Sequence, residues 1–121
     1  WLSYKGSWYW LGKSGAMAVG WTEVGNDLYL FDDDGRMLTG WQLTQDDNEW
    51  YYMHANGVMA IGWVQVDGSW YYLKASGAMA TGWVKVGDSW YYLSYSGAML
   101  TGTHTINGRT YVFDENGAWV G

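Results

Sequence analysis

The sequence predicts an all-β fold, a solenoid of six stacked β-hairpins that fills residues 1–121 as a single module. Three observations lead to this prediction. A Gly-Trp dipeptide returns about every 20 residues, a run of aromatic and branched residues lies between its occurrences, and Gly-containing dipeptides stand where a hairpin would reverse. The chain shows no helical periodicity.

Three short motifs follow one another in each copy. Gly-Trp begins at residues 20, 40, 62 and 82, and Gly102-Thr103 continues the series. Runs of the type Trp-Tyr-Tyr-Leu cover 8–11, 28–31, 50–53, 70–73, 90–93 and 110–113. A Gly-Ala-Met type of motif begins at 15, 35, 57, 77, 97 and 117. Six copies of the unit therefore account for the whole sequence.

Each copy predicts the same elements in the same order. In the fourth copy a short first strand covers 63–66, Asp67-Gly68 forms a tight turn, and a second strand covers 70–73. Gly77 then lets the chain turn back. The third copy has a longer turn at 44–49, which accounts for its two extra residues. Because an isolated hairpin is only marginally stable in water, the copies are expected to stack on one another.

Composition narrows the class of function. The chain has 11 Trp, 11 Tyr and only two Phe, and its formal net charge is −6. An acidic chain with few basic residues is a poor partner for nucleic acid or anionic lipid. The absence of Cys excludes disulfides and zinc-thiolate sites, and the apolar runs are too short for a transmembrane segment. The chain begins with Trp rather than Met and shows no signal peptide, so we expect a fragment or a mature module.

Side-chain alternation indicates where the rings point. Trp70 and Tyr72 share one face of the second strand and Leu73 lies on the other, with Trp63 on the ring face of the first strand. Trp63 and Trp70 could then meet Tyr91 of the next hairpin in an aromatic box. Periodicity alone equally allows these rings to be core. Repeated Trp and Tyr, however, suit recognition of a cation or of a sugar face, and the residues leave those two ligands open.

The repeat unit resembles the choline-binding repeat of bacterial cell-wall proteins, which include pneumococcal and phage surface proteins and lytic enzymes. The resemblance covers all six copies. It implies a left-handed solenoid of hairpins on the extracellular bacterial wall, with no catalytic role of its own. It also implies that phosphocholine of teichoic and lipoteichoic acids binds between consecutive repeats, held by two Trp of one repeat and a Tyr of the next, often with a Met nearby.

The resemblance assigns four complete boxes. They are Trp1, Trp8 and Tyr29; Trp41, Trp50 and Tyr71; Trp63, Trp70 and Tyr91; and Trp83, Trp90 and Tyr111. Met37, Met79 and Met99 are candidate fourth walls, with core packing as the alternative. The second copy departs from the pattern because Leu28 replaces the second Trp beside Trp21, which leaves its junction with Tyr51 doubtful. The sixth copy has Thr103 and Thr110 in both Trp positions and is interpreted as a terminal copy.

Other signals are weak. The run Asp32-Asp33-Asp34 lacks the alternating spacing of a calcium loop and is interpreted as a solvated turn. His54 and His104 show no spacing to a nucleophile or metal ligand. The first alternative to wall attachment is a glucan-binding module, because related aromatic-glycine repeats of glucosyltransferases and clostridial toxins bind sugars. The others are an enzyme, for which a carboxylate pair would have to assemble in space, and a structural solenoid that only displays another domain.

Overall fold

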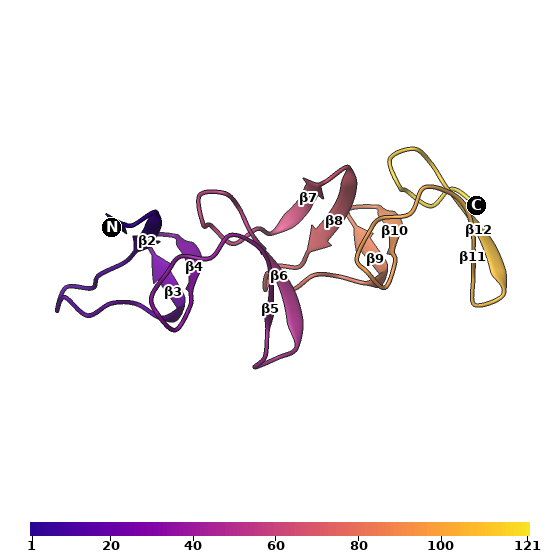
Figure 1. Cartoon of the computed structure of the whole chain (residues 1–121). Helices are drawn as coiled ribbons and strands as arrows, with labels where there is room; N and C mark the ends of the chain where they lie inside the picture. Colours follow the sequence, from indigo (N-terminus) through magenta and orange to yellow (C-terminus); the bar gives the residue numbers. More distant parts are fainter. The chain divides into compact units, whose positions relative to one another are not determined.

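The computed structural model describes all 121 residues and contains twelve strands and no helix. The strands are β1 (Leu2–Tyr4), β2 (Ser7–Tyr9), β3 (Gly20–Val24), β4 (Asp27–Phe31), β5 (Gly40–Thr44), β6 (Glu49–Met53), β7 (Gly62–Val66), β8 (Ser69–Leu73), β9 (Gly82–Val86), β10 (Ser89–Leu93), β11 (Gly102–Ile106) and β12 (Arg109–Phe113). Each odd-numbered strand pairs only with the next, so the strands form six antiparallel hairpins (Figure 1). The predicted all-β hairpin fold is confirmed.

The turns reverse the chain as their residue types require. Asp67 and Gly68 have φ values of 52° and 85°, so both central residues of the β7–β8 turn are left-handed. Asn107 and Gly108 repeat this geometry between β11 and β12. Asn, Asp and Gly tolerate positive φ best, and two-residue turns of this kind match the twist of a hairpin.

A third segment completes each copy after its second strand. In the fourth copy, Gly77 has a φ of 91° and its N–H donates to the carbonyl of Lys74, which closes a tight loop. The chain then returns along β8, where Met79 forms a bridge with Leu73 and the N–H of Ala80 donates to the carbonyl of Tyr72 at 2.8 Å. The recurring Gly-Ala-Met motif is therefore the start of a returning segment that lies beside the second strand.

The chain forms two compact units, Trp1–Ala60 and Ile61–Gly121. Within each unit, hydrogen bonds join the returning segment of one copy to the second strand of the copy before it. In the first unit the N–H of Met37 donates to the carbonyl of Trp8 at 2.9 Å, and in the second the N–H of Met99 donates to the carbonyl of Trp70 at 2.8 Å. Neighbouring hairpins are thus stacked within each unit, as the repeat pattern predicts.

The core lies on the face of the second strands opposite the position of the second box Trp. The largest fully buried side chains are Phe31, Met53, Leu73 and Leu93, which all end a second strand. In the fourth copy Leu73 is 0% exposed, whereas Trp70 on the other face is 41% exposed. The alternation predicted for this strand is confirmed. The structure contains no helix long and apolar enough to cross a membrane.

Candidate functional site

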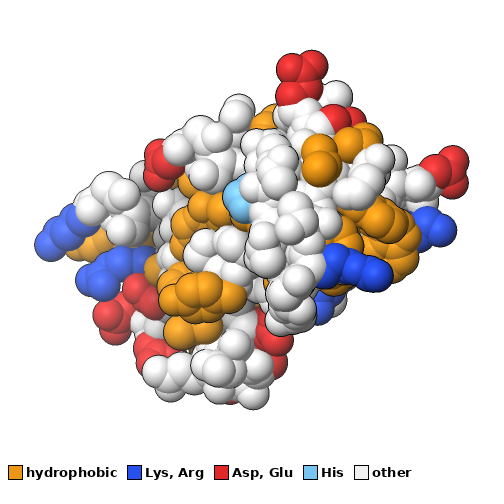
Figure 2. Space-filling model, turned by 90° about the vertical axis from the view of Figure 1, so that its right-hand side faces the viewer, with side chains coloured by type: hydrophobic (Ala, Val, Ile, Leu, Met, Phe, Trp, Pro, Cys, Tyr) orange, Lys and Arg blue, Asp and Glu red, His pale blue; other side chains and the backbone are white.

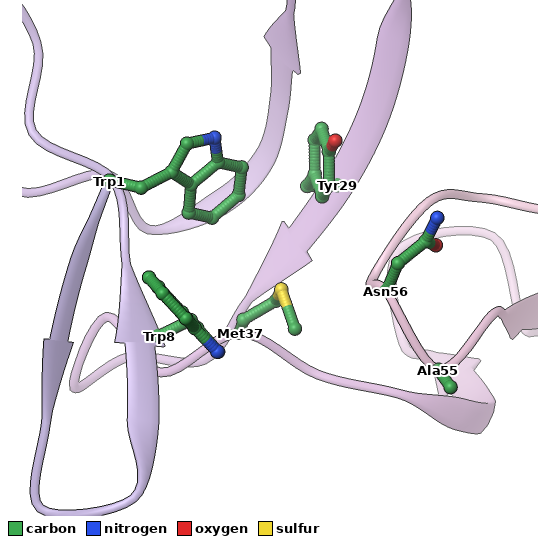
Figure 3. A pocket seen from close by; sticks show the side chains of 6 residues that line it. All are labelled: Trp1, Trp8, Tyr29, Met37, Ala55 and Asn56. Carbon is green, nitrogen blue, oxygen red and sulfur yellow. The ribbon is translucent and has the colours of Figure 1, made fainter.

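The first candidate site, here called cage A, lies between the first two hairpins. Trp1 and Trp8 come from the first hairpin, Tyr29 from β4, and Met37 from the returning segment of the second copy. Ala55 and Asn56, on the loop after β6, complete the lining of an open cavity of about 410 Å³. In Figure 3 the three rings and the Met37 side chain converge on one space, and the loop with Asn56 forms its far edge.

The rings of cage A meet edge to face. The ring centroid of Trp1 lies 4.8 Å from that of Tyr29 and 6.4 Å from that of Trp8, with interplanar angles of 68° and 86°. Rings at such angles line a concave space on several sides instead of stacking and filling it. Trp1 and Trp8 remain nearly half exposed. Figure 2 likewise shows hydrophobic side chains reaching the surface in several places.

Cage C repeats this arrangement in the second unit. Its cavity of about 280 Å³ is lined by Trp63, Trp70, Tyr91, Met99, Glu115 and Asn116. The ring centroids of Trp63 and Tyr91 lie 4.9 Å apart, close to the matching distance in cage A. Glu115 and Asn116 belong to the loop after β12, so three successive copies contribute to this cage as they do to cage A.

Cage D is the third arrangement and contains a fourth ring. Its cavity of about 370 Å³ is lined by Trp83, Trp90, Tyr111, Trp119 and Arg109. Trp119 occupies the position that Met has in the other copies, and its backbone N–H donates to the carbonyl of Trp90 at 2.8 Å. Its ring centroid lies 6.0 Å from both Trp83 and Tyr111. Sequence analysis missed Trp119 and Arg109, although the register of Gly117-Ala118-Trp119 with Gly-Ala-Met could have identified the first.

Met37, Met79 and Met99 all pack against glycines, and two of them also line cavities. Met37 and Met99 line cages A and C, and each also packs against a glycine of the following copy. A Cβ atom built on Gly57 or Gly117 would collide with the Met37 or Met99 side chain, respectively. Met79 packs in the same way on Gly97. The glycines are thus required by close packing as well as by their positive φ.

Comparison with known proteins identifies the repeats. A family profile described as "Choline-binding repeat" matches residues 18–61 and 60–102, and one described as "Putative cell wall binding repeat" matches residues 1–17. The chain belongs to the choline-binding repeat family. No curated protein sequence matches it. The matching family gives the glucan-binding alternative no support.

Solved structures of choline-binding proteins are similar to this chain. Choline binding protein F from Streptococcus pneumoniae, crystallised in the presence of a peptidoglycan analogue, is 40% identical, has a TM-score of 0.94, and is matched over 99% of this chain and 40% of its own. CbpJ from Streptococcus pneumoniae TIGR4 is 41% identical with a TM-score of 0.93, over 99% of this chain and 41% of its own. An endolysin from phage Cp-1, complexed with choline, is 32% identical with a TM-score of 0.61, over 94% and 37%. The chain thus spans about two fifths of these relatives.

The residues of the fourth predicted box, Trp41, Trp50 and Tyr71, are divided between the two compact units. Trp41 and Trp50 belong to the first unit, where their ring centroids lie 6.4 Å apart at 85°, the same geometry as Trp1 and Trp8. Tyr71 and Met79 belong to the second unit, on β8 and on the segment that follows it. The Trp41–Trp50 pair thus matches the Trp1–Trp8 pair of cage A, and the complete box stays a prediction.

At the junction of Trp21, Leu28 and Tyr51, the tyrosine is more deeply buried than the tyrosines of cages A, C and D. The ring of Trp21 meets that of Tyr51 at 5.0 Å, with Leu28 in the second Trp position, and Tyr51 is only 8% exposed. Its hydroxyl donates to the carboxylate of Asp47 in the longer turn. This hydrogen bond, together with burial, raises the pKa of Tyr51 to about 12. Hydrogen bonds from the hydroxyls of Thr44 and Tyr51 lower the pKa of Asp47.

The weak signals of the sequence have structural roles. One carboxylate oxygen of Asp32 accepts hydrogen bonds from the N–H groups of Asp34 and Arg36, both at 2.9 Å, and so holds the loop together. Asp114 does the same in the last copy. His104 lies in β11 with its Nε2 atom 2.7 Å from the carbonyl oxygen of Thr101. The structure brings no group of three metal-ligating side chains together.

Proposed function

We propose that this chain is a non-catalytic attachment module that binds the choline of phosphocholine groups on teichoic and lipoteichoic acids of the bacterial wall. One observation carries the proposal. In cages A, C and D, two Trp of one copy, a Tyr of the next and a Met or Trp of its returning segment converge on an open cavity.

The chemistry of these cages suits a quaternary ammonium. An aromatic ring is negative on its face and attracts a cation held over it, and the attraction is strongest for Trp. A trimethylammonium group is bulky and weakly hydrated, so it can touch several rings at once without a large desolvation cost. Each such contact contributes about 0.5–2 kcal/mol. After the cost of association, a single cage is expected to bind choline on the order of millimolar.

Several weak cages can still hold a wall polymer firmly. Once one choline of a polymer is bound, the others are present at a high effective concentration for the remaining cages. We therefore infer that residues 1–121 act as one module, in which cages A, C and D each bind one choline of the polymer. The match to a repeat described as cell wall binding, and to a protein crystallised with a peptidoglycan analogue, supports an extracellular role at the wall. Any lytic or adhesive activity is assigned to other parts of the parent protein.

Calorimetry with small ligands tests the proposal directly. Choline and tetramethylammonium are expected to bind at three or four sites per chain and to compete with each other, because both present methylated ammonium. Ammonium chloride at the same ionic strength is the matched control and should give no specific heat, because the strongly hydrated ion does not suit the rings. Heat released by dextran without any released by choline would refute the proposal and restore the glucan-binding alternative. Absence of heat with every ligand would favour a purely structural solenoid.

A further inference from the structure

The two cages of the second unit carry opposite charges at their rims. Glu115 lines cage C, whereas Arg109 lines cage D. The Trp–Tyr pairs are closely matched, with a centroid distance of 4.9 Å in each, although cage D has the Trp119 ring where cage C has Met99. Two cages that share these Trp–Tyr pairs but differ in rim charge are expected to differ in ligand preference. One ligand is choline, which is only a cation, and the other is phosphocholine, which also carries a phosphate anion.

Strand register explains how Arg109 reaches cage D. It lies two residues before Tyr111 on β12, and side chains two apart share a face of a strand. Tyr111 is a wall of cage D, so Arg109 points to the same side. The equivalent residue before Tyr91 of cage C is Ser89, which is too short to reach over the cavity and carries no charge.

The guanidinium group of Arg109 is available to a ligand. Arg109 is exposed, and both ion pairs of the structure are made by Arg36 in the other unit. An arginine stays protonated at any ordinary pH and offers a planar set of donors that fits phosphate oxygens. On the face shown in Figure 2, basic side chains lie directly beside groups of hydrophobic side chains.

A lone cation beside a cation-binding cage weakens binding of bare choline. The same charge becomes favourable when the ligand carries a phosphate two carbons from its ammonium group. The rings then hold the trimethylammonium end while the guanidinium pairs with the phosphate oxygens.

We propose that Arg109 makes cage D selective for phosphocholine over free choline, while Glu115 gives cage C the opposite preference. This inference rests on the proposed choline-binding function. It adds a residue that binds the phosphate of the ligand, and it gives the neighbouring cages C and D different ligand preferences.

Indole NMR signals of the intact chain can report on each cage separately. The Nε–H signal of Trp119 reports on cage D and that of Trp70 on cage C, after assignment with single Trp→Phe variants. Choline and phosphocholine are titrated separately at low salt. An exposed charge pair typically changes affinity about two- to fivefold. The expected result is tighter phosphocholine binding by about that factor at Trp119 and tighter choline binding at Trp70.

Substitution identifies the groups responsible. The Trp119 signal gives the affinities of cage D for phosphocholine and for choline. Arg109→Gln should lower the ratio of these two affinities to the value set by the rings alone. Arg109→Lys should keep part of the preference for phosphocholine. Glu115→Gln should raise the affinity of cage C for phosphocholine, measured at the Trp70 signal. Lys74→Gln is the matched control, since it removes the same charge from a loop that lines neither cage, and it should leave the ratio at Trp119 unchanged.

The outcomes separate this inference from the function on which it rests. If choline shifts the indole signals but Arg109→Gln leaves the ratio at Trp119 as in the parent chain, the role of Arg109 is refuted and choline binding stands. An equal effect of Lys74→Gln would also overturn it, because the preference would then reflect net charge. If neither ligand shifts any indole signal, the proposed function and this inference both fail.

Discussion

Trp70→Ala and Leu73→Ala test whether the rings of one strand are ligand walls or core. Both residues lie on β8, on opposite faces, so the two variants compare the two faces of one strand. Leu73 is fully buried, and truncating such a side chain costs about 2–5 kcal/mol because it leaves a dry cavity. Trp70 is 41% exposed and borders an open cavity that water can fill.

The cost of losing the Trp70 ring is therefore expected to be smaller. No dry cavity is left, so only the transfer cost of the covered part of the ring is lost, about 1–2 kcal/mol. The backbone bond that joins the copies survives, since the N–H of Met99 donates to the Trp70 carbonyl and not to its side chain. The ring of Trp63 also keeps its contact with Tyr72 at 5.0 Å.

Urea unfolding without ligand and choline calorimetry measure the two effects. Trp70→Ala should lose about one choline site and little stability, whereas the folded fraction of Leu73→Ala should keep every site. The reasoning is refuted if Trp70→Ala unfolds as readily as Leu73→Ala while choline stoichiometry per folded chain stays at the parent value. Cage C would then be part of the core.

Three further predictions follow from the geometry. Choline at ten times its Kd should stabilise the stacked form by about 1.4 kcal/mol per occupied site and raise the melting temperature, and an unchanged melting temperature would contradict the cages. Gly117→Ala should weaken choline binding at cage C more than Gly108→Ala does. Both glycines have nearly equal positive φ, but only the Cβ added at Gly117 collides with Met99. Equal effects of the two variants in choline titrations would show that backbone strain alone matters. The pKa of Tyr51 is raised from 10.0 to about 12, so the stability it contributes is complete below pH 10 and is lost as pH rises towards 12. Tyr51→Phe or Asp47→Asn should remove that alkaline loss in urea midpoints measured across this range, and an unaltered pH profile would count against the hydrogen bond.

The repeat, the hairpins and the ring faces could be read from the sequence because each depends on local rules. The 20-residue spacing fixes the copies, positive-φ dipeptides such as Asp67-Gly68 fix the turns, and the two-residue period of a strand separates Trp70 from Leu73. The rings expected to meet in cages A, C and D do line common cavities. In these cases one short segment specifies its own geometry.

Features that depend on tertiary contacts could not be predicted from the sequence in the same way. Trp119 becomes a cage wall only because its N–H reaches the carbonyl of Trp90 in the copy before. Arg109 joins the cavity through its length and register and belongs to no motif. The burial of Tyr51 against Asp47 depends on how the longer turn folds, which its composition does not specify.

Stacking and ligand binding share the same atoms in this chain. The hydrogen bond from the backbone N–H of Met99 to the carbonyl of Trp70 joins two hairpins, and the side chains of the same two residues line cage C. The Met99 side chain also packs against Gly117 of the following copy. A cage therefore exists only while its copies are stacked. A ligand that bridges the walls must stabilise the stack, and a substitution that loosens the stack must weaken binding even where no ring is touched.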